Sequence, residues 1–223
     1  MTTQAPYEYT RDYYQNVLDK AERFPRETSC WMSHLASIRG TKVLNVGCGP
    51  TLYDYLPWFG SEPQVCTGLD INQSTFDFLH QSQAPELLRA KRWIQKGDTH
   101  VEMICDDVFN CEERLAGQYD CILGVGFFAG FHNNRFDELM YIMKRALVDG
   151  GKLIKISWHG PHRSQSMTWK KLQYCYESVE FTDPDKLVFD IERNGFILER
   201  EDIIECDPAY GWDTIQACHF KSL

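Results

Sequence analysis

The chain has 223 residues, and 23 basic against 32 acidic side chains give it a formal net charge of −9 at pH 7. Its length favours one domain, and its negative charge counts against binding to nucleic acid or an anionic membrane, because both present phosphates that require a positive surface. With 43% hydrophobic residues the chain can bury a core, so a disordered protein is excluded.

The start of the chain and its cysteines bear on where the protein works. No charged segment followed by an apolar run opens the sequence, and no stretch approaches the ~18 apolar residues of a membrane span. The cysteines number nine, an odd count, and none falls in a Cys-x-x-Cys pattern. We therefore expect reduced cysteines, no bound metal and a cytoplasmic protein.

Apolar runs and helical patterns alternate along most of the chain. Residues 7–39 predict helices that cap the domain. Strands are predicted over 42–46, 65–69, 101–105, 119–123 and 152–157. Helices are predicted over 52–59, from about 74 to 93, over 136–147 and over 185–193. This alternation favours parallel strands joined by crossover helices.

The C-terminal part has a different pattern. Residues 196–204 and 212–220 are two extended runs without a helix between them, which predicts an antiparallel strand pair. The sequence as a whole predicts an α/β fold in one domain, 1–223, with a doubly wound, mostly parallel seven-stranded sheet, an antiparallel C-terminal pair and the N-terminal helical cap. Residues 158–183 are longer than a crossover loop and rich in aromatic residues, so we expect a lid that selects the substrate.

Glycines and carboxylates stand where the predicted strands end, and ligands of doubly wound sheets bind at that edge. Gly47 and Gly49 follow the first strand and permit a close backbone approach. Asp70 ends the second strand, where an acid can accept both hydroxyls of a ribose. Asp107 ends the third, where it can accept from an exocyclic amine. Residues 124–126 contain two glycines after the fourth strand and predict open space for a reacting group.

The glycine turn does not match the dinucleotide pattern. That pattern needs Gly or Ala three residues after the second glycine, and this chain has Leu52 there. Val108, next to the acid of the third strand, offers an apolar surface to a purine face. The strand ends therefore predict a site for an adenosine without phosphates.

These motifs resemble those of the class I S-adenosylmethionine-dependent methyltransferases over about residues 40–157. The matching segments are Val43-Leu-Asn-Val-Gly-Cys-Gly-Pro-Thr51, Gly68-Leu-Asp-Ile71, Cys105-Asp-Asp-Val108 and Leu147-Val-Asp-Gly-Gly-Lys-Leu-Ile154. The resemblance implies S-adenosyl-L-methionine as cofactor and S-adenosyl-L-homocysteine as product. The chain departs from the family at two positions, with Asn45 where an acid is common and Thr51 where a glycine is common.

A narrower resemblance concerns the start of the chain. Gly49-Pro-Thr-Leu-Tyr53, preceded by a tyrosine-rich segment, is similar to the nicotinamide, phenylethanolamine and indolethylamine N-methyltransferases. In that group N-terminal tyrosines close over the cofactor, and Tyr13 or Tyr14 would do so here. The full set of implied cofactor-binding residues is Tyr14, Asn45, Gly47, Cys48, Gly49, Thr51, Asp70, Ile71, Asp107, Val108 and Gly124.

Methyl transfer requires alignment of the two reactants and, for an acceptor that carries a proton, a base. Three residues near the ends of the fourth and fifth strands are candidates for the base or for an orienting group: His132, His159 and Tyr176. A metal site is not expected, because no third ligand accompanies the loop histidines. Asp207-Pro-Ala-Tyr210 resembles a signature of amino-methylating enzymes, but it lies between the last two strands and we interpret it as a turn.

We therefore expect a methyltransferase that acts on a small molecule, with nitrogen slightly favoured over oxygen as the acceptor. An O-methyltransferase of a small aromatic or acidic metabolite is the first alternative. A nicotinamide-dependent oxidoreductase and a non-catalytic scaffold that keeps the cofactor fold are the others. Cofactor binding distinguishes these classes.

Overall fold

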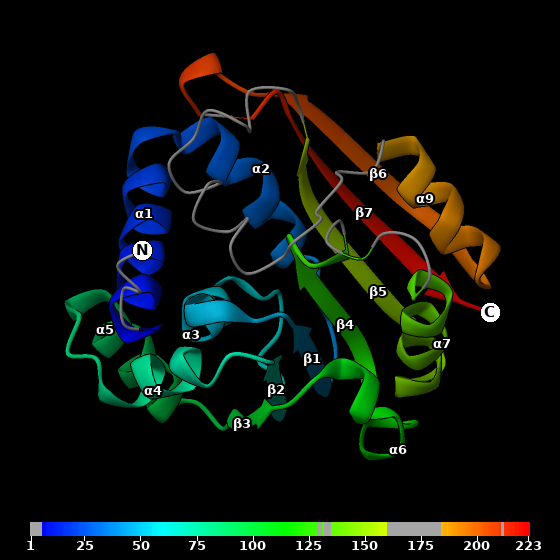
Figure 1. Ribbon diagram of the computed structural model, residues 1–223, viewed down its shortest axis with the longest axis horizontal. Coiled ribbons are helices and arrows are strands. Elements are labelled where there is room, and N and C mark those ends of the chain that lie inside the picture. The colour runs from blue at the N-terminus through cyan, green and yellow to red at the C-terminus, as the bar shows by residue number, and fades with distance from the viewer. Residues whose placement is uncertain (1–5, 129–130, 132–134, 160–183, 211) are drawn as a thin grey trace.

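The computed structural model describes residues 6–128, 131, 135–159, 184–210 and 212–223. At its centre is a seven-stranded sheet with the order β3-β2-β1-β4-β5-β7-β6 (Figure 1). β1 to β5 are parallel to one another, and β7 is antiparallel to both β5 and β6. The predicted α/β fold with an antiparallel C-terminal pair is confirmed. The strands are β1 Lys42–Val46, β2 Val65–Asp70, β3 His100–Cys105, β4 Tyr119–Val125, β5 Leu147–His159, β6 Phe196–Glu205 and β7 Thr214–Ser222.

Helices cover both faces of the sheet. On one face, Val43 of β1 is in register with Cys66 of β2 and Cys121 of β4, and these residues pack against α1 to α5. On the other face lie α6, α7 and α9. The α-helices are α1 Pro6–Arg23, α2 Pro25–Leu35, α3 Leu52–Tyr55, α4 Gln73–Gln81, α5 Pro85–Lys96, α6 Glu112–Leu115, α7 Phe136–Ala146 and α9 Pro184–Arg193, and the short 3₁₀ helices include η1 Gly49–Thr51, η2 Leu56–Trp58, η3 Val108–Asn110 and η6 Pro208–Tyr210.

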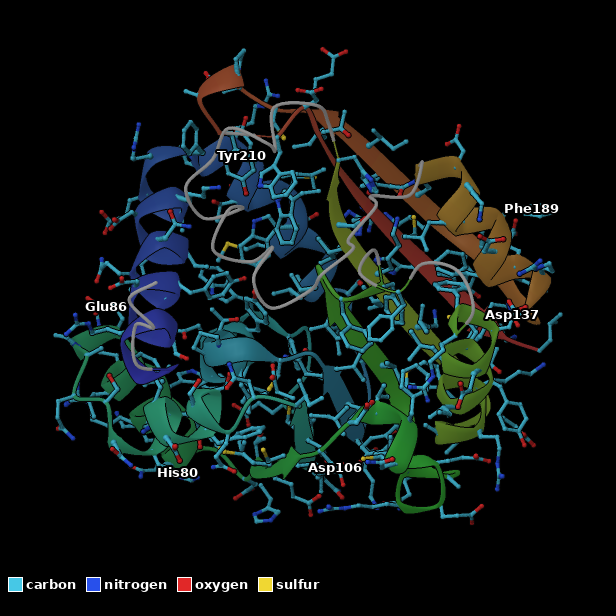
Figure 2. All side chains as sticks on the ribbon, viewed as in Figure 1. His80, Glu86, Asp106, Asp137, Phe189 and Tyr210 are labelled. Atoms are coloured by element: carbon cyan, nitrogen blue, oxygen red, sulfur yellow. The ribbon has the colours of Figure 1, made fainter. Side chains whose placement is uncertain are left out.

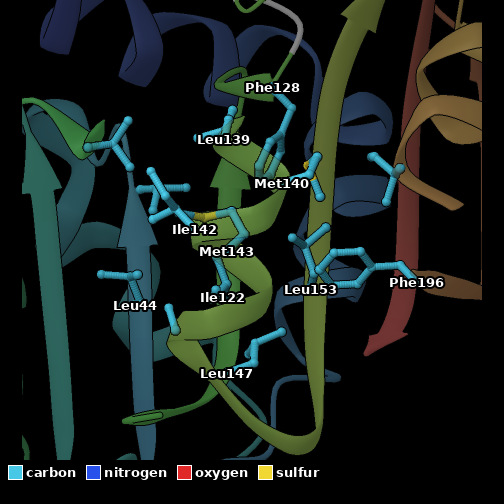
Figure 3. Packing of buried hydrophobic residues seen from close by; sticks show 14 of the residues in the cluster. Leu44, Ile122, Phe128, Leu139, Met140, Ile142, Met143, Leu147, Leu153 and Phe196 are labelled. Atoms are coloured by element: carbon cyan, nitrogen blue, oxygen red, sulfur yellow. The ribbon is translucent and has the colours of Figure 1, made fainter. Parts of the chain in front are cut away.

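Helix α7 anchors the second face of the sheet. Its apolar residues recur at helical spacing, and Leu139, Met140 and Met143 are completely buried. They belong to one cluster with Leu44 of β1 and Ile122 of β4, over which the helix lies (Figure 3). The helical spacing of these residues in the sequence predicted this buried face.

Three predicted elements differ from the structure. The single helix expected from about 74 to 93 is two helices, because the chain turns at Ser82 and restarts with Pro85 at the first position of α5. The helix expected over 52–59 is divided into α3 and η2, with Pro57 at the break. β5 begins at Leu147, which the sequence pattern assigned to the end of α7.

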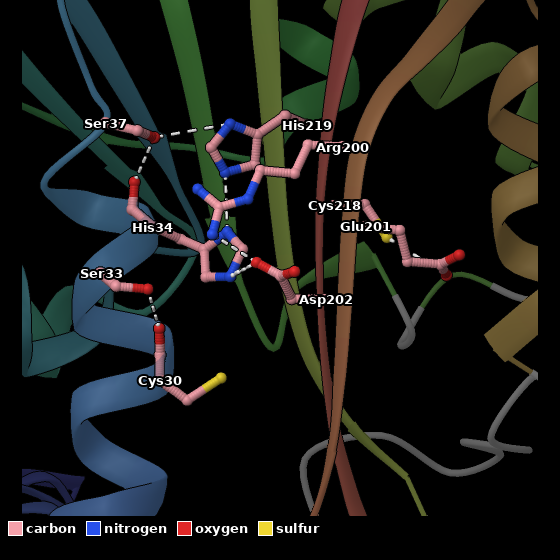
Figure 4. A network of polar contacts seen from close by, with 9 residues as sticks. All are labelled: Cys30, Ser33, His34, Ser37, Arg200, Glu201, Asp202, Cys218 and His219. Atoms are coloured by element: carbon pink, nitrogen blue, oxygen red, sulfur yellow. Dashed lines mark hydrogen bonds and ion pairs between the residues drawn. The ribbon is translucent and has the colours of Figure 1, made fainter.

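Polar contacts attach the N-terminal helices to the sheet. The hydroxyl of Thr10 on α1 lies 2.9 Å from that of Ser74 at the start of α4, close to the end of β2. Helix α2 is joined to the C-terminal strands by a buried pair, His34 and His219, whose Nδ1 and Nε2 atoms are 2.8 Å apart (Figure 4). Nε2 of His34 lies 3.1 Å from the carboxylate of Asp202 on β6. These contacts hold both helices against one face of the sheet.

Candidate functional site

The turn after β1 is built on two glycines in the left-handed backbone region. Gly47 has φ +59° and Gly49 has φ +54°, a conformation that costs glycine little and other residues more. A Cβ atom placed on Gly49 would meet none of the described residues within 4 Å, whereas on Gly47 it would collide with the ring of Phe127. The backbone is therefore open at Gly49 and covered at Gly47.

Asp70, the last residue of β2, is bonded to this turn. Its Oδ2 accepts the amide of Gly49 at 3.0 Å, and its Oδ1 accepts the amide of Asn72 at 2.9 Å. Burial raises the pKa of the carboxyl group, and the hydrogen bonds from the two backbone amides act in the opposite direction. Each carboxylate oxygen keeps a second lone pair, so Asp70 can still accept hydrogen bonds from a ligand.

Asn45 on β1 carries a buried amide without a partner. Its side chain is almost completely inaccessible, and among the described residues neither Nδ2 nor Oδ1 has a hydrogen-bond partner. A buried amide without a partner is costly, so a polar ligand group beside it would be stabilising. By the alternation of the strand, Asn45 shares the face of Val43, which packs against α2 and α3.

The side chains of the other two predicted residues of the turn are buried within the protein. Cys48 is buried, and its sulfur lies close to the Cα of Gly68 on β2, so only its backbone is available to a ligand. Burial holds the pKa of its thiol well above the usual value. The buried hydroxyl of Thr51 lies 3.4 Å from the carbonyl oxygen of Cys48, which ties the turn together.

At the end of β3, Asp107 caps η3, where its Oδ1 accepts the amide of Phe109 at 3.1 Å. Val108 is buried in the cluster under α7. Ile71 follows β2, whose last residue pairs with Cys105 of β3, and its side chain is 63% exposed. The apolar surface beside this strand end thus belongs to Ile71, and a planar base would cover it.

The end of β4 is more crowded than the sequence suggested. The ring of Phe128 packs against Gly124, where a Cβ atom would lie 2.9 Å from its Cδ2 atom. The indole of Trp158 approaches Gly126, 3.3 Å from a Cβ at that position. The expected open space over these glycines is absent, because aromatic rings fill it. Any role of Gly124 in binding the cofactor is then one for its backbone.

The two neighbouring tyrosines of α1 face different surroundings. The hydroxyl of Tyr14 donates to Asp54 at 3.1 Å, and its ring packs against Phe78, 5.1 Å between centroids, with 2% of the side chain exposed. Burial raises the pKa of the Tyr13 hydroxyl, and the negative charge of Asp70 adds to the effect. Of this pair, Tyr14 is fixed in the core by Asp54 and Phe78.

Two aromatic side chains near the end of β5, Trp158 and Tyr210, form a group that the sequence did not predict as part of the site. The indole nitrogen of Trp158 donates to the hydroxyl of Tyr210 at 3.1 Å. Tyr210 of η6 lies beside α2 (Figure 2) and packs edge-on against Phe24. Trp158 is the last residue but one of β5. Its position next to the end of a strand is the feature of the sequence that could have identified it as a site residue. Residues 158 and 159 belong to β5 and are therefore not part of the expected lid.

Of the proposed bases, the structure describes one. His159 ends β5, is buried, and its Nε2 lies 2.7 Å from the hydroxyl of Ser157. By strand alternation it lies on the opposite face from Trp158. His132 and Tyr176 lie outside the described residues, as does the segment 160–183. Within the described part of the chain no group of three metal-ligating side chains is found, and no helix there is long and apolar enough to cross a membrane.

Solved structures share this architecture at low sequence identity. The N-methyltransferase NodS from Bradyrhizobium japonicum WM9, in complex with S-adenosyl-L-homocysteine, has a TM-score of 0.60 and 14% identity, covering 89% of this chain and 86% of that chain. This is the fold of the S-adenosylmethionine-dependent methyltransferases. A comparison with protein-family models finds no match, and a comparison with curated proteins finds none.

Two further structures show how far this fold extends. A chain from the complex of the Haloferax volcanii Trm112 methyltransferase activator with a methyltransferase has a TM-score of 0.64 and 12% identity, covering 100% of this chain and 99% of that chain. The [4+2]-cyclase SpnF has a TM-score of 0.57 and 14% identity, covering 91% of this chain and 78% of that chain. Because one fold serves a methyltransferase and a cyclase, the reaction has to be argued from the site.

Proposed function

We propose that the protein is an S-adenosylmethionine-dependent methyltransferase acting on a small molecule, with nitrogen slightly favoured over oxygen as the acceptor. The observation that carries the proposal is the bond between the carboxylate of Asp70 and the amide of Gly49, 3.0 Å long. It places an acid that can accept ribose hydroxyls against an uncovered glycine backbone, at the ends of two adjacent strands.

The residues at this edge suit the parts of the cofactor. The ribose belongs at Asp70, the adenine against Ile71, and the amino-acid part beside the amide of Asn45. We assign to Tyr13 the place first given to Tyr14, because Tyr14 is buried in the core and its hydroxyl donates to Asp54. The remaining contacts proposed for the cofactor are backbone or capping groups of Gly47, Cys48, Gly49, Thr51, Asp107, Val108 and Gly124.

S-adenosylmethionine supplies a methyl carbon activated on a sulfonium, and the chain supplies alignment and a site without bulk water. Trp158, held by its bond to Tyr210, forms a fixed wall on the β5 side of the site. An acceptor that carries a proton also needs a base, and His132, His159 and Tyr176 stay the candidates. Of these, His159 is held by Ser157 at the end of β5.

The alternatives predict different ligands. Leu52 is completely buried at the start of α3, where a dinucleotide-binding helix needs a small residue for close approach. This disfavours a nicotinamide-dependent oxidoreductase. The net charge of −9 disfavours nucleic acid as the acceptor. The buried amide of Asn45, which has no partner among the described residues, disfavours a non-catalytic scaffold. Without a bound ligand, nothing would offset the free-energy cost of burying this amide.

Calorimetric titration tests the proposal. We expect S-adenosylhomocysteine to bind and NADH not to bind. A panel of small amines, with matched phenols and carboxylic acids, is then incubated with S-adenosylmethionine while formation of S-adenosylhomocysteine is measured. Conversion with amines supports the nitrogen acceptor, and conversion with phenols or acids alone supports the O-methyltransferase. Failure of S-adenosylhomocysteine to bind contradicts the proposal.

A further inference from the structure

The two glycines of the turn after β1 differ in what covers them. Gly49 is open, but the Cγ and Cε2 atoms of Phe127 would lie 3.2 Å from a Cβ of Gly47, closer than ordinary packing. The ring therefore rests directly on the Gly47 backbone, on the side from which a side chain would project. The proposed function needs this same surface for the amino-acid part of the cofactor.

Phe127 is held in place by other aromatic rings. Its centroid lies 4.7 Å from that of Phe131 and 5.4 Å from that of Phe128. Phe131 continues to Phe109, 5.8 Å away and edge-on, and the guanidinium carbon of Arg135 lies 3.3 Å from the centroid of Phe109. This aromatic row, formed by Phe127, Phe131 and Phe109, connects the glycine turn with the start of α7.

The rings of Phe127 and Phe128 are held to different degrees. Phe128 is 1% exposed and wedged against Gly124, so its displacement would open the core. Phe127 and Phe131 are only partly buried and sit at the edge of the same cluster. A side chain in such a position can change rotamer without opening the core. Of the two rings, Phe127 is the one that can leave its glycine.

We propose that the ring of Phe127 and S-adenosylmethionine compete for the surface of Gly47, so that the cofactor binds only after the ring has turned away. This inference rests on the proposed function. With the ring in the position described, Gly47 is covered and Gly49 is open. The measured affinity for the cofactor is the affinity of the open form multiplied by the fraction of molecules in which Phe127 is displaced.

Titration of two variants with S-adenosylhomocysteine tests the proposal. Phe127→Ala removes the competing ring, so we expect the dissociation constant to fall about three- to tenfold and association to become faster. Phe189→Ala is the matched control, because Phe189 is 63% exposed on the outer side of α9 (Figure 2) and its removal leaves affinity unchanged. Weaker binding by Phe127→Ala would overturn the proposal, because the ring would then be a wall of the site.

Nuclear magnetic resonance gives a second readout that does not depend on affinity. The ring current of Phe127 shifts the resonances of the Gly47 α-protons, and Phe127→Ala abolishes this shift. In the wild-type protein the shift disappears on saturation with S-adenosylhomocysteine if the ring turns away, and its persistence would overturn the proposal. Binding by the wild type with an unmoved ring refutes this inference alone. Absence of binding in both wild type and Phe127→Ala refutes the proposed function.

Discussion

The carboxylate of Asp70 connects the ends of two strands, because it accepts a backbone N–H hydrogen bond from the residues that follow each of them. Its partners are Gly49 after β1 and Asn72 after β2. The sequence predicted a carboxylate at this position, because a short apolar run ends there. It did not predict the bond to Gly49, because that bond depends on the left-handed backbone of the turn.

Replacing Asp70 by alanine is expected to weaken the binding of S-adenosylhomocysteine by about 1–3 kcal/mol, since the ribose loses charge-assisted hydrogen bonds. Calorimetric titration measures the effect. Asp149→Ala is the control, because Asp149 is exposed in the irregular first part of β5, before the regular pairing with β4 that begins at Lys152. Equal affinities of the two variants, both folded, would show that the ribose does not bind at Asp70.

The tyrosine pair of α1 gives opposite expectations for two neighbouring positions. Tyr13→Phe removes the hydroxyl proposed to reach the cofactor, and we expect a several-fold loss of cofactor affinity with little change in stability. Tyr14→Phe removes the donor to the half-buried carboxylate of Asp54, and is expected to lower the free energy of unfolding by about 1–2 kcal/mol while leaving affinity unchanged. Titration and denaturant unfolding of both variants separate the roles, and the reverse pattern would restore Tyr14 to the site.

The sequence could not decide which of Tyr13 and Tyr14 faces the cofactor, and the reason is geometric. Adjacent residues on a helix point about 100° apart, so only one of two tyrosines can face a given ligand. The choice depends on how α1 is turned, which is determined by contacts such as that between Thr10 and Ser74, 64 positions apart. The positions of Trp158 and Phe127 likewise depend on contacts with glycines far away in the sequence.

Among the elements, those with strong periodicity were predicted closely and those that contain breaks were not. α7 shows a regular apolar spacing, and a helix was predicted over 136–147, one residue longer than the helix in the structure. Helices α4 and α5 were merged, because the interruption at Ser82 and Pro85 is short and both helices are amphipathic. The C-terminal pair was predicted, but the insertion of β7 between β5 and β6 was not stated, since strand order is a property of the whole sheet.

The attachment of α2 to the sheet is expected to weaken in acid. Burial lowers the pKa of His219 to about 4, and it also lowers that of His34, with Arg200 and Lys152 adding to the effect and Asp202 opposing it. The unfolded chain therefore binds more protons than the folded protein below about pH 6.5, and stability falls as the pH decreases from there toward 4. The loss is at most about 1.4 kcal/mol per pH unit for each proton.

Denaturant unfolding at a series of pH values checks this expectation. In a variant carrying His34→Gln and His219→Gln, the stability should depend less on pH between 4 and 6.5 than in the wild type. A comparison of slopes is used because the substitutions also change the stability at neutral pH. Parallel curves for the two proteins would show that the histidine pair does not titrate on unfolding.

The molecule as a whole positions the candidate site through the sheet alone. β2, β1, β4 and β5 are consecutive in the sheet, so the residues at their ends lie along one edge although they range from Gly49 to Trp158 in the chain. This edge follows from the alternation of strands and helices, which the sequence displays. For that reason the cofactor side of the site was predicted more completely than the acceptor side.

A ligand that binds at this edge is expected to stabilise the entire fold. At a concentration one hundred times its dissociation constant, S-adenosylhomocysteine should add about 2.7 kcal/mol, which raises the unfolding temperature by roughly 5–10 °C for a chain of this size. Thermal unfolding with and without the compound measures the shift, and NADH serves as the control. A shift with NADH of the same size would favour the oxidoreductase.

The placement of β7 has a consequence for the order in which the protein can assemble during synthesis. β6 emerges from the ribosome before β7, yet among the described strands β7 is the one that pairs with it. The strand and α9, which precedes it, therefore have no sheet edge to join until residues 214–222 have been made and have paired with β5. A nascent chain halted between β6 and β7 would expose Phe196 and Leu198 to chaperones, although both become covered in the finished protein.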